Sequence, residues 1–205
     1  MSNVLELNPG KREQTKATNR LAILDAARAV FGEIGFDAAT VRDIIRRTSL
    51  SVGAFYNYFK SKEEVFNALA DDGARRFRPI LQAQSARATD FESYVRAAVR
   101  AYFDFLAAEN EAWFPEGHGQ SAPYSRNTPE MLAVFDEVHD VFAAIMDRDI
   151  SAQVDLDYLA AAAIAVAREI GEEMMERRPL DVAGATEFVV RFIMGGLNAL
   201  PRRNA

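Results

Sequence analysis

Apolar positions along the chain recur every three to four residues, and the two-residue alternation typical of strands is scarce. Near the start, Leu24, Ala27, Phe31 and Ile34 share one helical face, and Gly35 follows as a natural helix end. The pattern predicts an all-α protein. The expected helices cover about residues 15–34, a short segment from 40, 52–59, 61 to a kink or end at Pro79, 89–108, 128–148, 155–177 and 181–200.

Capping sequences mark three closely spaced helix starts. Thr40 precedes Asp43 by three residues, Ser51 stands before an apolar pair, and Ser61 opens a capping box with Glu64. Two short helices joined by a tight turn form the helix-turn-helix unit. The segment 40–59 therefore predicts such a unit, with a second helix short enough to enter a DNA major groove about 12 Å wide.

The side chains of this segment divide into two groups. Ile44, Ile45, Leu50 and Phe55 are expected to anchor the second helix on the first. Gly53 leaves room for a close approach to a phosphate, and the free N–H groups at the helix starts suit phosphate oxygens. Phe55 and Phe59 are expected in the core rather than on DNA.

Composition narrows the class of protein. The chain has 205 residues, and it contains no cysteine, which excludes disulfides, thiolate metal sites and a Cys nucleophile. Its longest apolar run, Tyr158–Ala167, is half of the roughly 20 residues that a membrane span needs. The N-terminus lacks an apolar core followed by a cleavage site. We therefore expect a cytoplasmic protein, associated with the nucleoid when bound to DNA.

Charge is distributed unevenly. The net charge is −6, yet residues 1–78 hold 13 Lys and Arg against 10 Asp and Glu, whereas the remainder is strongly acidic. Within residues 40–62 the basic side chains of Arg42, Arg46, Arg47, Lys60 and Lys62 face only one acid before residue 63. A basic module on an acidic body indicates that the module meets a polyanion. A solvated, Arg-rich helix face is the alternative.

The segment TVRDIIRRTSLSVGAFYNYFKSKEEVF, together with the preceding AARAVFGEIGFDAAT, resembles the N-terminal domain of the TetR (tetracycline repressor) family of bacterial transcriptional regulators. The resemblance covers about residues 16–66, and Gly53–Glu63 is its most distinctive stretch. The chain departs from the family at Thr48-Ser49, where Ala-Gly is usual, and at Ile45, where a small Ala is common.

The resemblance implies roles for individual residues. The implied contacts to DNA phosphates are Thr40, Ser51, Tyr56, Tyr58 and Lys62. The implied contacts to base edges are Arg42, Val52, Ala54 and Asn57. Of these, Arg42 is the best candidate for direct reading, because arginine pairs with guanine O6 and N7.

The resemblance also implies a domain organisation. Residues 1–14 are predicted to form a flexible arm, and residues 15–60 a three-helix, helix-turn-helix DNA-binding domain. Residues 61–205 are predicted to form a C-terminal helical bundle for ligand binding and dimerisation, with 61–87 as the linking helix. The implied function is a ligand-responsive regulator, a repressor released from a palindromic operator by a small-molecule inducer.

The acidic body supplies candidates for both of its implied tasks. Small or apolar residues on the last two helices predict the dimer interface: Ala160, Ala163, Ile164, Ala167, Gly171, Phe188, Phe192, Gly195 and Gly196. Burial inside one subunit is the alternative. Aromatic and apolar residues of the middle helices predict a ligand pocket: Tyr102, Phe103, Leu106, Trp113, Phe114, His118, Tyr124, Met131, Phe135, Val138, Phe142 and Met146.

Two other functions remain as alternatives: an enzyme and a helical adaptor that does not bind DNA. No Ser or Lys is paired with a positioned His, and no Gly-rich phosphate loop is present, so we expect no catalytic residues and no cofactor. Asp136, His139 and Asp140 share a helix face, but three such ligands are more typical of a solvated face than of a metal site. The phosphate-contacting residue types argue against an adaptor.

Overall fold

The computed structural model describes residues 10–113, 128–149 and 154–201. Every regular element among them is an α-helix, which confirms the predicted fold class. The helices are α1 (Lys11–Ala38), α2 (Val41–Arg46), α3 (Val52–Tyr56), α4 (Lys62–Arg87), α5 (Phe91–Trp113), α6 (Pro129–Asp149), α7 (Leu156–Glu176) and α8 (Val182–Ala199). None of the described helices is long and apolar enough to cross a bilayer.

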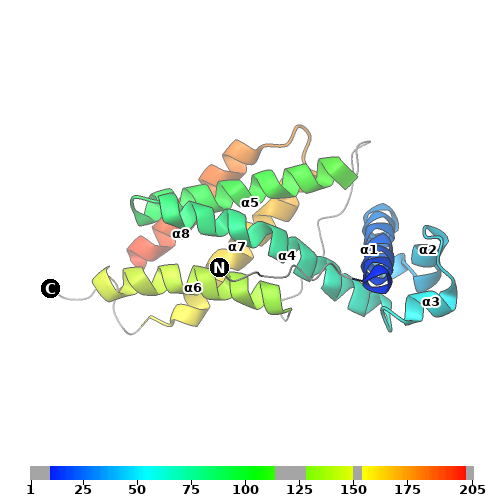
Figure 1. Ribbon diagram of the computed structural model, residues 1–205. Coiled ribbons are helices and arrows are strands. Elements are labelled where there is room, and N and C mark those ends of the chain that lie inside the picture. Colours follow the sequence, from blue (N-terminus) through cyan, green and yellow to red (C-terminus); the bar gives the residue numbers. More distant parts are fainter. Residues whose placement is uncertain (1–9, 114–127, 150–153, 202–205) are drawn as a thin grey trace, which may run out of the picture.

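The helices form two groups (Figure 1). Helices α1–α3, which we call the head, lie at one end of the molecule, and helices α4–α8, which we call the body, form a bundle beside them. Each group has its own cluster of buried apolar side chains. Helix α4 contributes to both, because Val65 and Leu69 belong to the cluster of the head whereas Ala74 and Leu81 belong to that of the body.

Side-chain caps begin the short helices where the sequence predicted them. The Thr40 hydroxyl accepts from the Asp43 N–H at 3.3 Å, and an Asp43 carboxylate oxygen accepts from the Thr40 N–H at 3.0 Å. The Ser51 and Ser61 hydroxyls accept from backbone N–H groups three residues ahead. These bonds satisfy donors that the first turn of a helix leaves free, so the local sequence sets the three starts.

Several helix ends differ from the prediction. Helix α1 begins at Lys11, so residues 11–14 are helical rather than part of an arm. Gly35 interrupts α1 with φ of 78°, a conformation that favours glycine, and the last turn follows it. Helix α3 ends at Tyr56 instead of Phe59. Helix α5 continues to Trp113, about five residues beyond the expected end.

Pro79 does not end α4, which continues to Arg87. A proline inside a helix removes one backbone hydrogen bond, at a cost of about 3 kcal/mol. Helix α4 packs against both α5 and α6, and the buried Leu81 follows just after the proline. Tertiary packing therefore outweighs the local penalty, which a reading of the sequence alone could not include.

Candidate nucleic-acid interface and internal cavity

Helix α3 is held by one face and leaves the other free. Phe55 is 1% exposed and packs in the core of the head with Ile44 of α2, which is fully buried. On the outer side, Val52 is 54% exposed and Tyr56 is 53% exposed. The segment after Leu50 therefore lies at the surface, where it can reach a duplex.

The predicted base-reading residues lie on this outer side, although not equally. Arg42, Val52 and Asn57 are exposed, whereas Ala54 is half-buried. Arg42 comes from α2 and the others come from α3 or its end. The two short helices thus bring the four residues to one end of the molecule.

Two predicted phosphate contacts, Thr40 and Ser51, already act as helix caps. The Thr40 hydroxyl donates to an Asp43 carboxylate oxygen at 2.6 Å, and the Ser51 hydroxyl accepts from the Ala54 N–H at 3.2 Å. The hydrogen bonds from the Thr40 side chain and backbone lower the pKa of Asp43. Both cap residues are exposed. Their positions at helix starts suit a phosphate, since uncompensated N–H groups point outward there.

Lys62 is held inside the protein. Its ammonium donates to the backbone carbonyl oxygens of Phe36, Asp37 and Ala39 at 2.8, 3.2 and 3.0 Å, and it lies 4.5 Å from the Phe36 ring centroid. An ammonium has three donors, so these bonds account for all of them. A phosphate contact by Lys62, as the resemblance implies, would require breaking at least one. The geometry instead makes Lys62 a clamp between the end of α1 and the start of α4.

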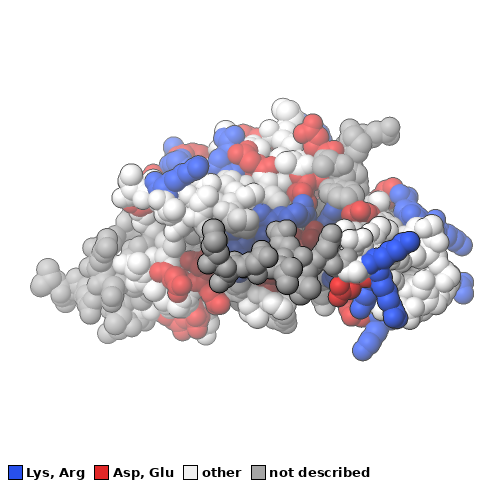
Figure 2. All heavy atoms as spheres, viewed as in Figure 1, with Lys and Arg blue, Asp and Glu red and all other residues white. Residues whose placement is uncertain are grey.

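The other basic side chains of the head differ in how freely they stand. Arg46 is 77% exposed in its side chain and lies 3.7 Å from Asp43, whereas Arg47 pairs with Glu33 of α1. The Tyr58 hydroxyl, a predicted phosphate contact, accepts from the Asn19 side chain at 3.1 Å and is partly buried. In Figure 2, Lys and Arg side chains stand out from the head, while both signs are interspersed over the visible face of the body.

A cavity of about 170 Å³ lies inside the body. It is enclosed by α4, α5, α6 and α7, with Ile193 from α8, and its wall is almost entirely hydrocarbon. The charged lining residues are Arg168 and Glu172 of α7, whose side chains pair at 2.8 Å. Burial, with a smaller contribution from Glu137, raises the pKa of the lining residue Tyr94 to about 12, so its hydroxyl stays neutral.

The predicted pocket residues are only partly confirmed as cavity lining. Tyr102, Leu106, Met131, Val138 and Phe142 line the cavity. Phe103 does not, because it is fully buried in the packed core behind the wall. Phe135 is absent from the lining, and its ring stacks on His139. The candidates Trp113, Phe114, His118, Tyr124 and Met146 have side chains outside the described residues.

Sequence reasoning missed much of the lining. Helix α4 contributes Leu69, Ala70, Gly73, Ala74, Phe77 and Leu81, and none of these was predicted. No signal in the sequence marks them, because apolar residues at helical spacing look the same beside a cavity and inside a packed core. Gly73 is informative in the structure, since a Cβ added there would meet nothing within 4 Å.

The α7 part of the predicted dimer interface is wrong. Ala160 is fully buried within the subunit, and Gly171 packs against Leu106 and Phe103 of α5. The remaining three, Ala163, Ile164 and Ala167, line the cavity. The small side chains of α7 therefore allow close packing inside one subunit rather than between two.

The predicted interface residues on α8 are at the surface. Phe188 is 53% exposed and Phe192 is 58% exposed, with their rings stacked 6.2 Å apart. Gly195 and Gly196 are also exposed, and a Cβ at either would meet nothing within 4 Å. This face of α8 has no apolar partner within the described part of the subunit.

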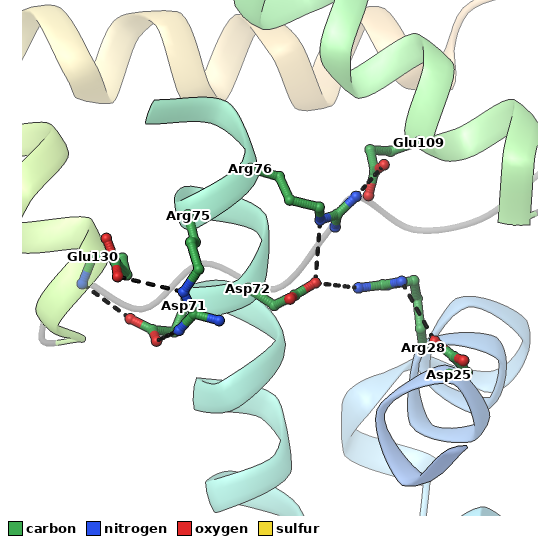
Figure 3. A network of polar contacts seen from close by, with 8 residues as sticks. All are labelled: Asp25, Arg28, Asp71, Asp72, Arg75, Arg76, Glu109 and Glu130. Atoms are coloured by element: carbon green, nitrogen blue, oxygen red, sulfur yellow. Dashed lines mark hydrogen bonds and ion pairs between the residues drawn. The ribbon is translucent and has the colours of Figure 1, made fainter. Parts of the chain in front are cut away.

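Charged side chains join the head to the body through α4 (Figure 3). Asp72 of α4 lies between Arg28 of α1, at 3.3 Å, and Arg76, at 3.2 Å, and Arg76 continues to Glu109 of α5 at 2.5 Å. Burial lowers the pKa of Arg28, whereas the hydrogen bond from Glu109 raises that of Arg76. A second set, Asp71, Arg75 and Glu130, ties α4 to α6. Both sets flank Gly73 in the sequence.

The acidic face considered for a metal does not assemble a ligand cluster. The two ring nitrogens of His139 lie 3.8 Å from Asp140 and 3.5 Å from Asp157. Among the described residues no three His, Asp or Glu side chains converge as a metal site would require. His139 instead bridges α6 and α7 at the surface.

Comparison with known proteins agrees with this geometry. Residues 23–69 match the family model described as bacterial regulatory proteins, tetR family. The chain is 24% identical over 181 residues to the transcriptional activator FasR of Mycolicibacterium smegmatis, covering 87% of this chain and 83% of FasR. It is 38% identical over 72 residues to the transcriptional repressor Rv1474c of Mycobacterium tuberculosis, covering 35% of this chain and 38% of that protein.

Solved structures share the whole fold. The fatty acid degradation regulator FadR from Bacillus halodurans superposes with a TM-score of 0.67 at 22% identity, over 93% of this chain and 98% of that one. FadR from Bacillus subtilis, solved in complex with stearoyl-CoA, has a TM-score of 0.66 at 17% identity, over 86% of this chain and 98% of that one.

Fold and interface together define a helix-turn-helix DNA-binding regulator of transcription. More narrowly, the matched segment 23–69 contains α2, α3 and the start of α4, the same elements that form the candidate interface. The chain belongs to the tetR family of bacterial regulatory proteins. That assignment is to regulators rather than enzymes, and it agrees with the absence of a catalytic set from the sequence.

Proposed function

We propose that the chain is a ligand-responsive transcriptional regulator that binds a palindromic operator as a homodimer in the bacterial cytoplasm, and that a small molecule in the body releases it. One observation carries the proposal: α4 forms a wall of an internal cavity and, one turn away, holds the DNA-reading head. The Rv1474c match supports repression and the FasR match supports activation. Release by an inducer is the form that we put to the test.

The proposed contacts with DNA follow from exposure. Arg42 reads a base edge in the major groove, and Val52 and Ala54 supply apolar contact, for example to a thymine methyl. Asn57 bonds to a base or a phosphate, and Thr40, Ser51, Tyr56 and Tyr58 hold the backbone. A dimer places two such heads about 34–36 Å apart, one turn of the duplex.

The proposed dimer contact is the exposed face of α8. Phe188 and Phe192 together leave a stacked aromatic pair on the surface, next to Gly195 and Gly196, where a second helix can approach closely. Apolar patches of this kind mark interaction sites. We expect Phe192→Asp to convert the dimer into monomers in sedimentation, and to lower affinity for a palindromic duplex more than for a single half-site.

The proposed coupling passes through α4. A ligand in the cavity presses on the face of α4 that includes Gly73, while the adjacent Asp72 holds Arg28 of the head. A small rotation of α4 therefore changes the position of the head relative to the body, and in a dimer it changes the spacing of the two heads. The ligand favours whichever arrangement it binds more tightly.

Selection of duplexes from a random pool, followed by affinity measurements over a range of salt, tests DNA binding. If a dimer contacts six or more phosphates, affinity falls by about a thousandfold or more between low and physiological salt. Arg42→Ala should cost about 1–3 kcal/mol and relax one position in each half-site. Arg100→Ala, which removes an exposed arginine of the body, serves as the control. Failure to select any sequence would overturn the proposal.

A further inference from the structure

The shape of the cavity restricts what can fill it. Its lining runs from Leu69 to Leu81 along α4 and from Tyr94 to Leu106 along α5. At 1.5 Å per residue each wall is about 18 Å long. A round cavity of about 170 Å³ would be less than half that length. The cavity is therefore a narrow channel that follows the axis of the bundle.

The chemistry of the wall is equally restrictive. Almost every lining group is a Phe, Leu, Ile, Val, Met or Ala side chain, and the charged groups are Arg168 and Glu172. Gly171, which immediately precedes Glu172, packs against Leu106. The charged pair therefore lies at the Leu106 end of the channel, next to the head, and the Tyr94 and Leu81 end is apolar apart from one neutral hydroxyl.

We infer that the channel binds an extended aliphatic acyl chain, with its carbonyl oxygen at Arg168 and its methyl end near Tyr94. A polar group placed elsewhere along the wall would lose its hydration without a partner. Since a chain of single bonds advances about 1.2 Å per bond, an 18 Å channel holds about 14 bonds. The acyl group can come from a free fatty acid or from a thioester. This inference rests on the proposed ligand response and gives its ligand a class.

The similarity to FadR of Bacillus subtilis does not by itself assign this ligand. At 17% identity it shows a shared fold, and stearoyl-CoA belongs to that protein. The argument here depends on the length, lining and charged end of the channel in this chain.

A chain-length series tests the inference directly. Straight-chain fatty acids of increasing length, below their micelle concentrations, are titrated into the full-length protein by calorimetry, with the matching CoA thioesters and primary alcohols as separate arms. Each buried methylene should tighten binding about fourfold, up to about 14 carbons, after which the gain should stop. The acid and thioester arms identify the source of the acyl group. Affinity that does not depend on chain length would overturn the inference.

Two substitutions locate the chain. Ala98→Leu narrows the channel from α5, so the gain should stop at a shorter chain. Ala108→Leu makes the same change at an exposed position of the same helix and should leave the series unchanged. Circular dichroism and binding to the selected duplex confirm that each variant is folded. Equal series for the two variants would place the ligand outside the channel.

A second pair locates the carbonyl. Arg168→Gln should weaken acids or thioesters by about tenfold and the alcohols much less, because only the former present a carbonyl oxygen to the guanidinium. Arg177→Gln removes an exposed arginine that pairs with Glu173 and should change neither. Equal losses for all three arms would overturn the orientation.

The outcome also separates this inference from the proposed function. If the protein binds its selected duplex but no acyl compound, only the ligand class is wrong. If acyl chains bind with the expected length dependence but leave the duplex bound, the ligand class stands and the release mechanism fails.

Discussion

The head and the body use apolar side chains in opposite ways. In the head, Phe55, Ile44 and Ile23 are at most 1% exposed, and side-chain caps occupy the helix starts. The body buries more residues yet keeps a channel along its axis. A filled core fixes the geometry of a reading surface, whereas an unfilled one leaves α4 able to respond to an occupant. The difference explains how one chain can be rigid where it reads and adaptable where it senses.

The largest expected effect comes from emptying the core of the head. Phe55→Ala removes a fully buried ring and should destabilise the head by about 3–5 kcal/mol. Val52→Ala, on the exposed side of the same helix, is the control and should change stability by less than about 0.5 kcal/mol. Chemical denaturation followed by circular dichroism measures both. Similar stabilities for the two variants would mean that the head is not close-packed.

Lys62 offers the next test, because its contacts decide whether it belongs to the scaffold or to the DNA interface. Lys62→Met removes three charge-assisted hydrogen bonds and should destabilise the head by about 2 kcal/mol. If Lys62 contacts no phosphate, the slope of log affinity against log salt stays the same. A direct phosphate contact would instead reduce that slope by about 1. Lys60→Met, at the neighbouring exposed lysine, is the matched control.

Asp72→Asn addresses the junction between the two regions. It takes one carboxylate from Arg28, whose side chain is 12% exposed, and from Arg76, and should cost about 1–2 kcal/mol. Asp104→Asn removes an exposed pair and should cost less than about 1 kcal/mol. We expect unfolding of the Asp72 variant to separate into two transitions, one for each region. A single, equally cooperative transition would argue against Asp72 as the junction.

The smallest effect concerns pH and the head alone. The pKa of Asp43 is lowered in the folded state by its hydrogen bonds with Thr40. A lowered carboxyl pKa contributes stability that is present above the unfolded value, about 3.9, and is lost as the pH falls through the folded value. The melting temperature of the wild type should therefore fall below about pH 4 more steeply than that of Asp43→Asn. Parallel pH profiles would show that the cap contributes nothing.

The contrast between the regions also explains what the sequence could predict. Helix starts at Thr40, Ser51 and Ser61 depend on bonds within four residues, so local sequence sufficed to predict them. Whether Pro79 ends α4 depends on packing against α5 and α6, which local sequence does not contain.

The site predictions divide along the same line. Exposure of Arg42, Val52 and Tyr56 followed from the two-faced pattern of a short helix. The small residues of α7 were assigned to a dimer because a helix with small side chains invites a close neighbour, and the pattern does not say which neighbour. In the structure that neighbour is α5, and Gly171 is the point of contact. Which residues line the channel depends on where packing is incomplete, and that is a property of the assembled bundle.

The exposed rings of Phe188 and Phe192 have a consequence for handling the protein. Because association through them would follow mass action, the apparent melting temperature should rise with protein concentration. Dilute preparations would then lose activity faster than concentrated ones, and a small amount of detergent would mimic the missing neighbour.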